Sequence, residues 1–247
     1  MKIINRVSHF ESEKKKKFIE LYKNCSIPEQ EILSNLGLFI TSRDLKRILF
    51  LNDLYKKIID VNGVIFELGT RYGQNMVLFS SFRDIYEPYN NFRKIVGFDT
   101  FQGFLSVHDK DGSNEYNRMG NYSVPNDYEI YLGKLLDFHN SLTPTEHIQK
   151  YQLIKGDACK TINDYLKEYP STIIALAYFD LDLYEPTKIC LEKILPHLTK
   201  GSIVVFDELN NEQFPGETIA VREVMGLDKY KIHRAPYSGA VSYIIIE

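Results

Sequence analysis

The chain has 247 residues, of which 44% are hydrophobic and 26% charged, with a formal net charge of −3 at pH 7. A chain of this length and composition can bury one large core, so we expect one domain with appendages. The slight acidic excess gives no electrostatic basis for a nucleic-acid partner, which would require Lys and Arg concentrated on one face.

Residues 1–60 have a helical pattern and are predicted to form an N-terminal helical extension. The basic run at 14–17 lies between acidic residues and is predicted to be the solvated face of a helix. Thr41 and Ser42 precede an amphipathic run whose apolar residues fall mostly on one broad face. The sequence does not fix the oligomeric state, but an exposed apolar face on these helices is compatible with a homo-oligomer. The apolar residues of the run are Leu45, Ile48, Leu49, Leu51, Leu54, Ile58 and Ile59.

From residue 61 to 247, short β-prone runs alternate with helical patterns. This alternation predicts an α/β domain with a doubly wound, seven-stranded, mostly parallel sheet. The strands are expected at 64–66, 95–98, 151–154, 173–179, 203–206, 230–233 and 241–246.

A long segment, 102–150, separates the second predicted strand from the third. Its first half is rich in Gly, Asn, Asp and Ser, whereas residues 128–141 are helical in pattern. Long ordered insertions above the ligand-binding edge of a sheet usually bind or cover substrate. We therefore predict that residues 102–150 form a lid over the ligand-binding edge of the sheet.

The first predicted strand runs into Glu67 and then a glycine turn, Gly69 to Gly73, before a helix. Such a junction lets the backbone approach a nucleotide-like ligand. Arg71 stands where the middle glycine of a pyrophosphate-binding loop would be, which argues against NAD or FAD. Glu67 suits a ligand with an ammonium group better than one with a phosphate.

Two aspartates follow the next two strands. Asp99 is placed to accept hydrogen bonds from two ribose hydroxyls, and Asp157 to accept from an adenine amino group. Each could instead be a turn or helix-cap residue, and Phe101 could pack rather than contact ligand. Taken together, the pattern fits S-adenosylmethionine. The residues expected at this cofactor site are Glu67, Gly69, Arg71, Gly73, Asn75, Asp99, Phe101, Asp157, Ala158 and Asp180.

Two further strands end in carboxylates. Asp180 and Asp182 follow the run 173–179, and Asp207 and Glu208 follow the run 203–206. Ligands of parallel sheets bind beyond the carboxyl ends of the strands. These acidic strand ends suggest a site for a divalent metal ion.

The three cysteines, Cys25, Cys159 and Cys190, are odd in number, widely separated and without CxxC spacing. They support neither a disulfide framework nor a zinc site, and a reducing compartment is expected. The sequence shows neither an apolar stretch long enough to span a membrane nor a signal peptide. A cytoplasmic location is therefore predicted.

These motifs together resemble the class I S-adenosylmethionine-dependent methyltransferases. Segments 98–104, 120–125, 179–187 and 199–208 are similar to sugar O-methyltransferases of antibiotic pathways, of the macrocin and novobiocin type and still more of the calicheamicin rhamnose type. The resemblance covers roughly residues 60–225. It implies a Rossmann-like fold, S-adenosylmethionine as cofactor, and a sugar or sugar-nucleotide hydroxyl as the acceptor.

The resemblance also implies that Asp180, Asp207 and Glu208 bind a metal ion. Three hard oxygen donors without His or Cys favour Mg²⁺, which would lower the pKa of an acceptor hydroxyl and orient it. Glu208 stands where Asp or Asn is usual, and this departure weakens the expectation that the metal is required.

Methyl transfer to a hydroxyl also needs a general base that takes up the proton. Leu183 stands where related catechol-type enzymes carry a basic residue, so the base must come from elsewhere. Asp180 is our first candidate, with Asp182, His108 and Asp109 in reserve. Asp182 could instead cap the following helix, and His108 could be an ordinary loop residue.

Other functions stay open. The lid decides the acceptor, so a nitrogen or phosphoramidate acceptor is an alternative. An iron-dependent hydroxylase would need two histidines and a carboxylate, and no His lies near Asp180 or Asp207 in sequence. A non-catalytic subunit would bind S-adenosylmethionine without turnover.

Overall fold

The computed structural model describes residues 9–236 and 241–247, so the first eight residues of the predicted N-terminal extension lie outside the described part. The strands are β1 (Val64–Leu68), β2 (Ile95–Asp99), β3 (Tyr151–Lys155), β4 (Ile174–Phe179), β5 (Leu198–Phe206), β6 (Ile232–Arg234) and β7 (Ser242–Ile245). They form one sheet in the order β3-β2-β1-β4-β5-β7-β6. β1 to β5 are parallel, and β7 is antiparallel to its two neighbours. The predicted seven-stranded, mostly parallel sheet is confirmed.

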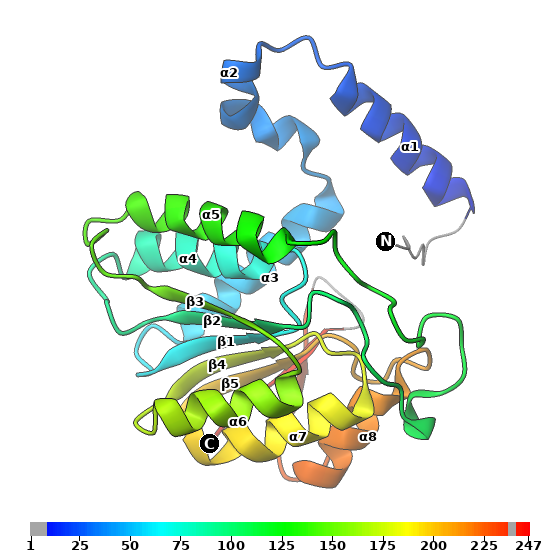
Figure 1. Ribbon diagram of the computed structural model, residues 1–247, viewed down its shortest axis with the longest axis vertical. Coiled ribbons are helices and arrows are strands. Elements are labelled where there is room, and N and C mark those ends of the chain that lie inside the picture. The colour runs from blue at the N-terminus through cyan, green and yellow to red at the C-terminus, as the bar shows by residue number, and fades with distance from the viewer. Residues whose placement is uncertain (1–8, 237–240) are drawn as a thin grey trace.

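Helices cover both faces of the sheet (Figure 1). One face carries α3 (Ser42–Lys57), α4 (Gln74–Tyr86) and α5 (Tyr128–Ser141), and the other carries α6 (Ala158–Glu168), α7 (Tyr184–Ile194) and α8 (Pro215–Val224). Each face has its own buried apolar cluster, because β1 to β5 are apolar on both sides. Within the described residues, no helix combines the length and apolar character needed to cross a membrane.

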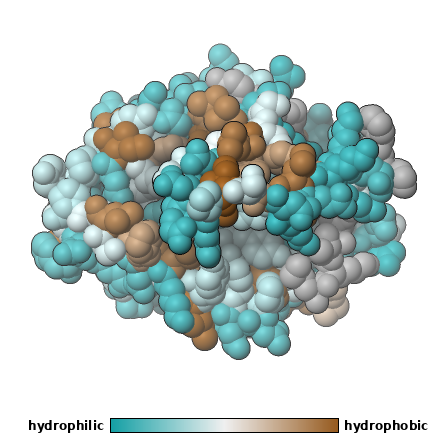
Figure 2. All heavy atoms as spheres, turned by 90° about the horizontal axis from the view of Figure 1, so that it is seen from above, coloured by the Kyte–Doolittle hydropathy of each residue, from teal (hydrophilic) through white to brown (hydrophobic). Residues whose placement is uncertain are grey.

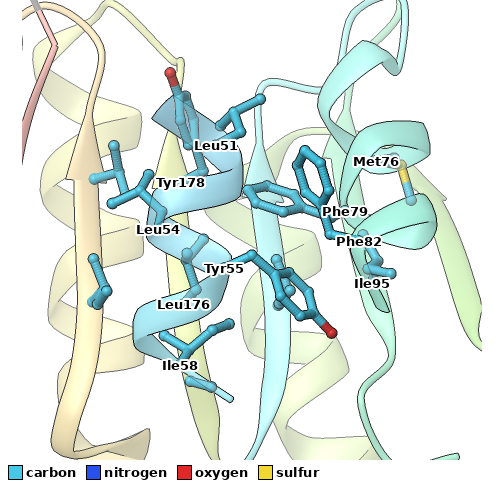
Figure 3. Packing of buried hydrophobic residues seen from close by; sticks show 14 of the residues in the cluster. Leu51, Leu54, Tyr55, Ile58, Met76, Phe79, Phe82, Ile95, Leu176 and Tyr178 are labelled. Atoms are coloured by element: carbon cyan, nitrogen blue, oxygen red, sulfur yellow. The ribbon is translucent and has the colours of Figure 1, made fainter. Parts of the chain in front are cut away.

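The helix α3 brings the N-terminal segment onto the sheet. Thr41 caps it through a capping box with Asp44, in which each residue's side chain bonds to the other's backbone N–H. Its buried residues pack between α4 and β4, as Figure 3 shows. The predicted apolar face is too broad, because Leu45, Leu49 and Ile59 point away from the sheet and are exposed. The residues that Figure 3 labels on the two helices are Leu51, Leu54, Tyr55, Met76, Phe79 and Phe82, and it also labels Ile58 just after α3.

Residues 9–41 form what we call the N-terminal arm, which stands away from the sheet (Figure 1). It contains α1 (His9–Lys23), α2 (Glu29–Ile32) and the 3₁₀ segment η1 (Leu33–Phe39). Phe39 holds these pieces together by edge-on contact with Tyr22, at 4.9 Å between ring centroids. Figure 2 looks down on this side of the molecule, where apolar side chains lie among polar ones. The predicted homo-oligomer stays a prediction.

The predicted lid segment divides into two parts. Its second half is α5, with the bounds expected from sequence, and it packs against α4 and β3 as an ordinary crossover helix. Its first half runs over the carboxyl edge of the sheet and contains the short 3₁₀ segment η2 (Asp109–Asp111). The predicted lid is therefore reduced to residues 102–127.

Lys150, just before β3, is a buried cation. Its Nζ donates to Thr143 Oγ1 at 2.6 Å and to Thr145 Oγ1 at 2.8 Å. Burial, and then nearby Arg83, lower the pKa of Lys150 from its ordinary value of 10.5. Between the lowered pKa and 10.5, the unfolded chain thus binds more protons at Lys150 than the folded chain does. The free energy of unfolding therefore rises with pH in that window.

We expect Lys150→Met to remove this rise, because the variant has no buried ammonium group to titrate. Urea unfolding between pH 7 and 10 measures it, with Lys134→Met on the exposed side of α5 as the matched control. A pH profile identical to that of the wild type would contradict the assignment.

Candidate active site

A cavity of about 1280 Å³ lies at the carboxyl edge of the sheet. Ordinary small-ligand sites measure about 300–1,000 Å³, so this one has room for two ligands. Each of the five parallel strands contributes the residues at its tip, and the N-terminal arm forms the roof. The strand-tip residues that line it include Gly69, Asp99, Asp157, Asp180 and Asp207.

The glycine turn after β1 is shaped by the neighbouring tip of β4. Gly69 has φ +93°, and a Cβ on it would lie 2.0 Å from the carbonyl oxygen of Asp180. Only glycine fits such an approach. Gly73 begins α4 at φ +75°, with no room for a Cβ beside Leu132. The predicted junction thus brings backbone, rather than side chain, to the floor of the cavity.

Asp99 joins two loops at the cavity wall. One carboxylate oxygen accepts from Arg71 N at 2.6 Å, and the other accepts from Phe101 N at 2.5 Å. Burial raises the pKa of Asp99, and these two N–H donors partly offset that rise. Both donors belong to residues in the left-handed backbone region, at φ +48° and +58°. Asp99 therefore fixes the shape of the turn as well as offering an acceptor.

Asp157 is the helix cap that sequence left as an alternative. Its carboxylate accepts from Cys159 N at 3.0 Å at the start of α6. Asp157 and the adjoining Ala158 both line the cavity. A role in ligand binding is therefore compatible with the capping role.

Two buried polar side chains at the end of β1, Glu67 and Thr70, each carry one oxygen left unpaired by the described residues, although neither lines the cavity. These oxygens are Glu67 Oε2 and Thr70 Oγ1. Burial, and then the nearby Asp180 carboxylate, raise the pKa of Glu67 well above its ordinary value. Buried polar atoms in native proteins are nearly always hydrogen-bonded. A cationic donor bound here would satisfy Glu67, which agrees with the predicted ammonium group.

The three predicted metal ligands already have protein partners. Asp180 Oδ2 lies 3.7 Å from Arg47 Nη2, and Asp207 Oδ1 accepts from the Tyr178 hydroxyl at 2.6 Å. Glu208 accepts from the side-chain amide of Asn211. Over residues 9–236 and 241–247, no three His, Cys, Asp or Glu side chains are grouped so as to hold a metal ion. The chemistry of these carboxylates suits Mg²⁺, but each would have to leave its protein partner to bind the ion.

Asp182 does not cap α7. Its backbone has φ +62°, its side chain is buried at the cavity, and α7 begins after Leu183 with no side-chain cap. Instead, the Asp111 carboxylate of the predicted lid accepts from Tyr184 N at 2.6 Å. The lid thus bonds to the segment that carries Asp180.

Five predicted site residues do not line the cavity, namely Glu67, Gly73, Asn75, Phe101 and His108. His108 is exposed, and its Nδ1 accepts from Lys110 N at 3.0 Å while its ring packs on Tyr184. Phe101 is buried in the apolar cluster with α4 and α5. Neither lines the cavity wall. His108 is the ordinary loop residue, and Phe101 the packing residue, that sequence left open.

Arg47 of α3 is the main cavity residue that sequence reasoning missed. Its Nε and Nη2 donate to Asn75 Oδ1 at 3.3 and 3.2 Å, and its guanidinium faces Asp180. Asn75 was predicted to contact the cofactor, but it supports Arg47 from behind the cavity wall. No local motif surrounds Arg47, so only its placement in the fold identifies it.

This sheet order, the glycine turn after β1 and the cavity across the strand tips define a class I methyltransferase of Rossmann-like fold. Two solved structures of CalS11 are similar over nearly the whole chain. One, described as a calicheamicin methyltransferase, is 45% identical, with 98% of this chain and 94% of that chain covered and a TM-score of 0.94. The other, an apo structure described as a TDP-rhamnose 3′-O-methyltransferase, is 42% identical, with 98% and 96% covered and a TM-score of 0.86.

A third structure, the O-methyltransferase NovP, is 17% identical, with 82% and 80% covered and a TM-score of 0.58, and it shows the fold alone. Comparison with family models and with curated sequences found no match. The chain belongs to the S-adenosylmethionine-dependent O-methyltransferase family of CalS11. The family resemblance inferred from the motifs is confirmed.

Proposed function

We propose that this protein transfers a methyl group from S-adenosylmethionine to a hydroxyl of a sugar or sugar nucleotide. The observation that carries this proposal is the 45% identity, over nearly the whole chain, to CalS11. The cavity supports it, because Lys14 and Lys15 of the roof and Arg43 of α3 line the same space as the acidic strand ends. Such cations suit the phosphates of a sugar nucleotide.

The cofactor end follows the order of the strands. Asp157 and Ala158 at β3 receive the adenine, Asp99 at β2 the ribose, and Glu67 with the Gly69 turn at β1 the amino-acid end. When bound, S-adenosylmethionine supplies a methyl group on a positively charged sulfur. The protein's remaining tasks are to hold the acceptor oxygen in line and to take up its proton.

The acceptor end is formed by the tips of β4 and β5. Asp180 is the proposed general base, because its carboxylate lies at the cavity beside the glycine turn. Asp207 is oriented by the Tyr178 hydroxyl and offers its second oxygen to a sugar hydroxyl. Asp182, buried next to Asp180, is the reserve base.

Assistance by Mg²⁺ stays a prediction. Asp180, Asp207 and Glu208 would hold the ion after leaving Arg47, Tyr178 and Asn211, and its chemistry would be to acidify the acceptor hydroxyl. Proton transfer to Asp180 requires no metal. Turnover that survives EDTA unchanged would remove Mg²⁺ from the proposal and leave the methyl transfer standing.

Calorimetric titration tests the function. We expect micromolar binding of S-adenosylhomocysteine and a further signal from a thymidine- or guanosine-diphosphate sugar, measured with and without Mg²⁺. S-adenosylhomocysteine binding without any sugar-nucleotide signal would shift the acceptor to another class, such as an amine. No binding of either ligand would contradict the proposal as a whole.

A further inference from the structure

The side chain of Arg47 lines the cavity close to Asp180 at the tip of β4. Arg47 extends from α3 to the tips of β1 and β4, where it meets Asn75 of α4 and Asp180. Asn75 is buried, so it anchors one side of the guanidinium in a fixed position. The opposite side lines the cavity. Arg47 is therefore held in place rather than extended into solvent.

Only some of the N–H donors of the Arg47 guanidinium group have hydrogen-bond partners. A guanidinium has five N–H donors, and Asn75 Oδ1 takes one from Nε and one from Nη2. The other three have no hydrogen-bond partner among the described residues. At 3.7 Å, the contact with Asp180 is an ion pair beyond hydrogen-bond distance. The cavity thus presents a positioned cation whose donors match the two oxygens of a carboxylate.

Carboxylates surround this cation. The pKa of Arg47 is lowered by burial, but the Tyr178 hydroxyl and the carboxylates of Asp207, Asp180 and Glu67 raise it more, so the guanidinium stays charged. Glu67 Oε2 nearby lacks a hydrogen-bond partner within the described part of the chain. Arg47 at the cavity wall therefore donates to an anion, while Glu67, buried near it at the end of β1, accepts from a cation that reaches that strand end. That pair of features fits the zwitterionic end of an amino acid.

We propose that Arg47 binds the carboxylate of the cofactor's amino-acid end, while Glu67 accepts from its ammonium group. This inference rests on the cofactor placement of the proposed function. Cofactor binding then exchanges the Arg47–Asp180 ion pair for an Arg47–carboxylate contact. Asp180 is thereby released toward the acceptor only when the cofactor is present, and α3, which carries the N-terminal arm, becomes part of the cofactor site.

The test compares two ligands that differ in that carboxylate alone. Calorimetry with S-adenosylmethionine and with decarboxylated S-adenosylmethionine, which keeps the ammonium and the sulfonium, is run on the wild type and on Arg47→Met. We expect the variant to lose about 10- to 100-fold in affinity for S-adenosylmethionine and less than about 3-fold for the decarboxylated ligand. Arg47→Lys keeps the charge without the fork and should fall between the two.

Lys46→Met is the matched control, because it removes one positive charge from the neighbouring exposed position of the same helix. An equal loss for both ligands would show that Arg47 only supports the fold. A gain for the decarboxylated ligand alone would show that Arg47 only neutralises the carboxylates. Either result overturns the inference while wild-type binding of S-adenosylmethionine leaves the proposed function intact. If Arg47→Met does not fold, the Lys variant and the wild-type preference between the two ligands decide it.

Discussion

Replacing Asp180 with Asn is expected to lower kcat by about 10²- to 10⁴-fold, the range that a general base contributes. The amide keeps the size of the side chain and cannot accept the proton of an acceptor hydroxyl. The dissociation constant of S-adenosylhomocysteine should stay within about 3-fold, because the carboxylate acts on the acceptor side of the cavity. Steady-state kinetics and calorimetry on the same preparations measure the two quantities.

Asp182→Asn is the comparison that gives this result its meaning. Asp182 lies two positions further along the same loop and is also at the cavity. Asn tolerates the left-handed backbone at this position, φ +62°, nearly as well as Asp does. A large loss of kcat in Asp182→Asn with little loss in Asp180→Asn would transfer the base to Asp182. A large loss of cofactor affinity in Asp180→Asn would show that Asp180 contacts the cofactor rather than the acceptor.

The strand tips were predictable because their signal is local. An apolar run followed directly by a carboxylate, as at Phe179-Asp180 and Phe206-Asp207, marks a buried strand that ends at a polar edge. Parallel pairing then brings these tips together without any long-range information. The same reasoning located the helix over 128–141, because its apolar spacing is regular.

What could not be predicted depends on contacts between distant segments. The bond from Tyr184 N to Asp111 joins residues 73 positions apart, and it lies where sequence left a cap by Asp182 as an alternative. Arg47 contacts Asn75 across 28 positions of sequence and Asp180 across 133. Sequence spacing identifies a polar side chain but not the partner that tertiary packing assigns to it. The metal site stays a prediction for the same reason, since the sequence does not show that each of its three carboxylates has a protein partner.

Asp99→Ala is expected to weaken S-adenosylhomocysteine binding by about 1–3 kcal/mol, or roughly 5- to 150-fold. Two effects contribute. The ribose hydroxyls lose their acceptor, and the N–H groups of Arg71 and Phe101 lose theirs, at 2.6 and 2.5 Å. The second effect also loosens the turn beside Gly69, so Asp99→Asn should recover only part of the affinity, because its NH₂ opposes one of the two N–H donors.

Calorimetry with the 2′-deoxyribose analogue of S-adenosylhomocysteine separates the two effects. If Asp99 binds the ribose, the wild type prefers the parent ligand and Asp99→Ala loses that preference. Asp157→Ala removes a carboxylate that caps α6 at the next strand tip and should keep the preference, which makes it the matched control. A preference that survives in Asp99→Ala would mean that Asp99 only shapes the turn, because the hydroxyls would then be recognised by other groups of the cavity.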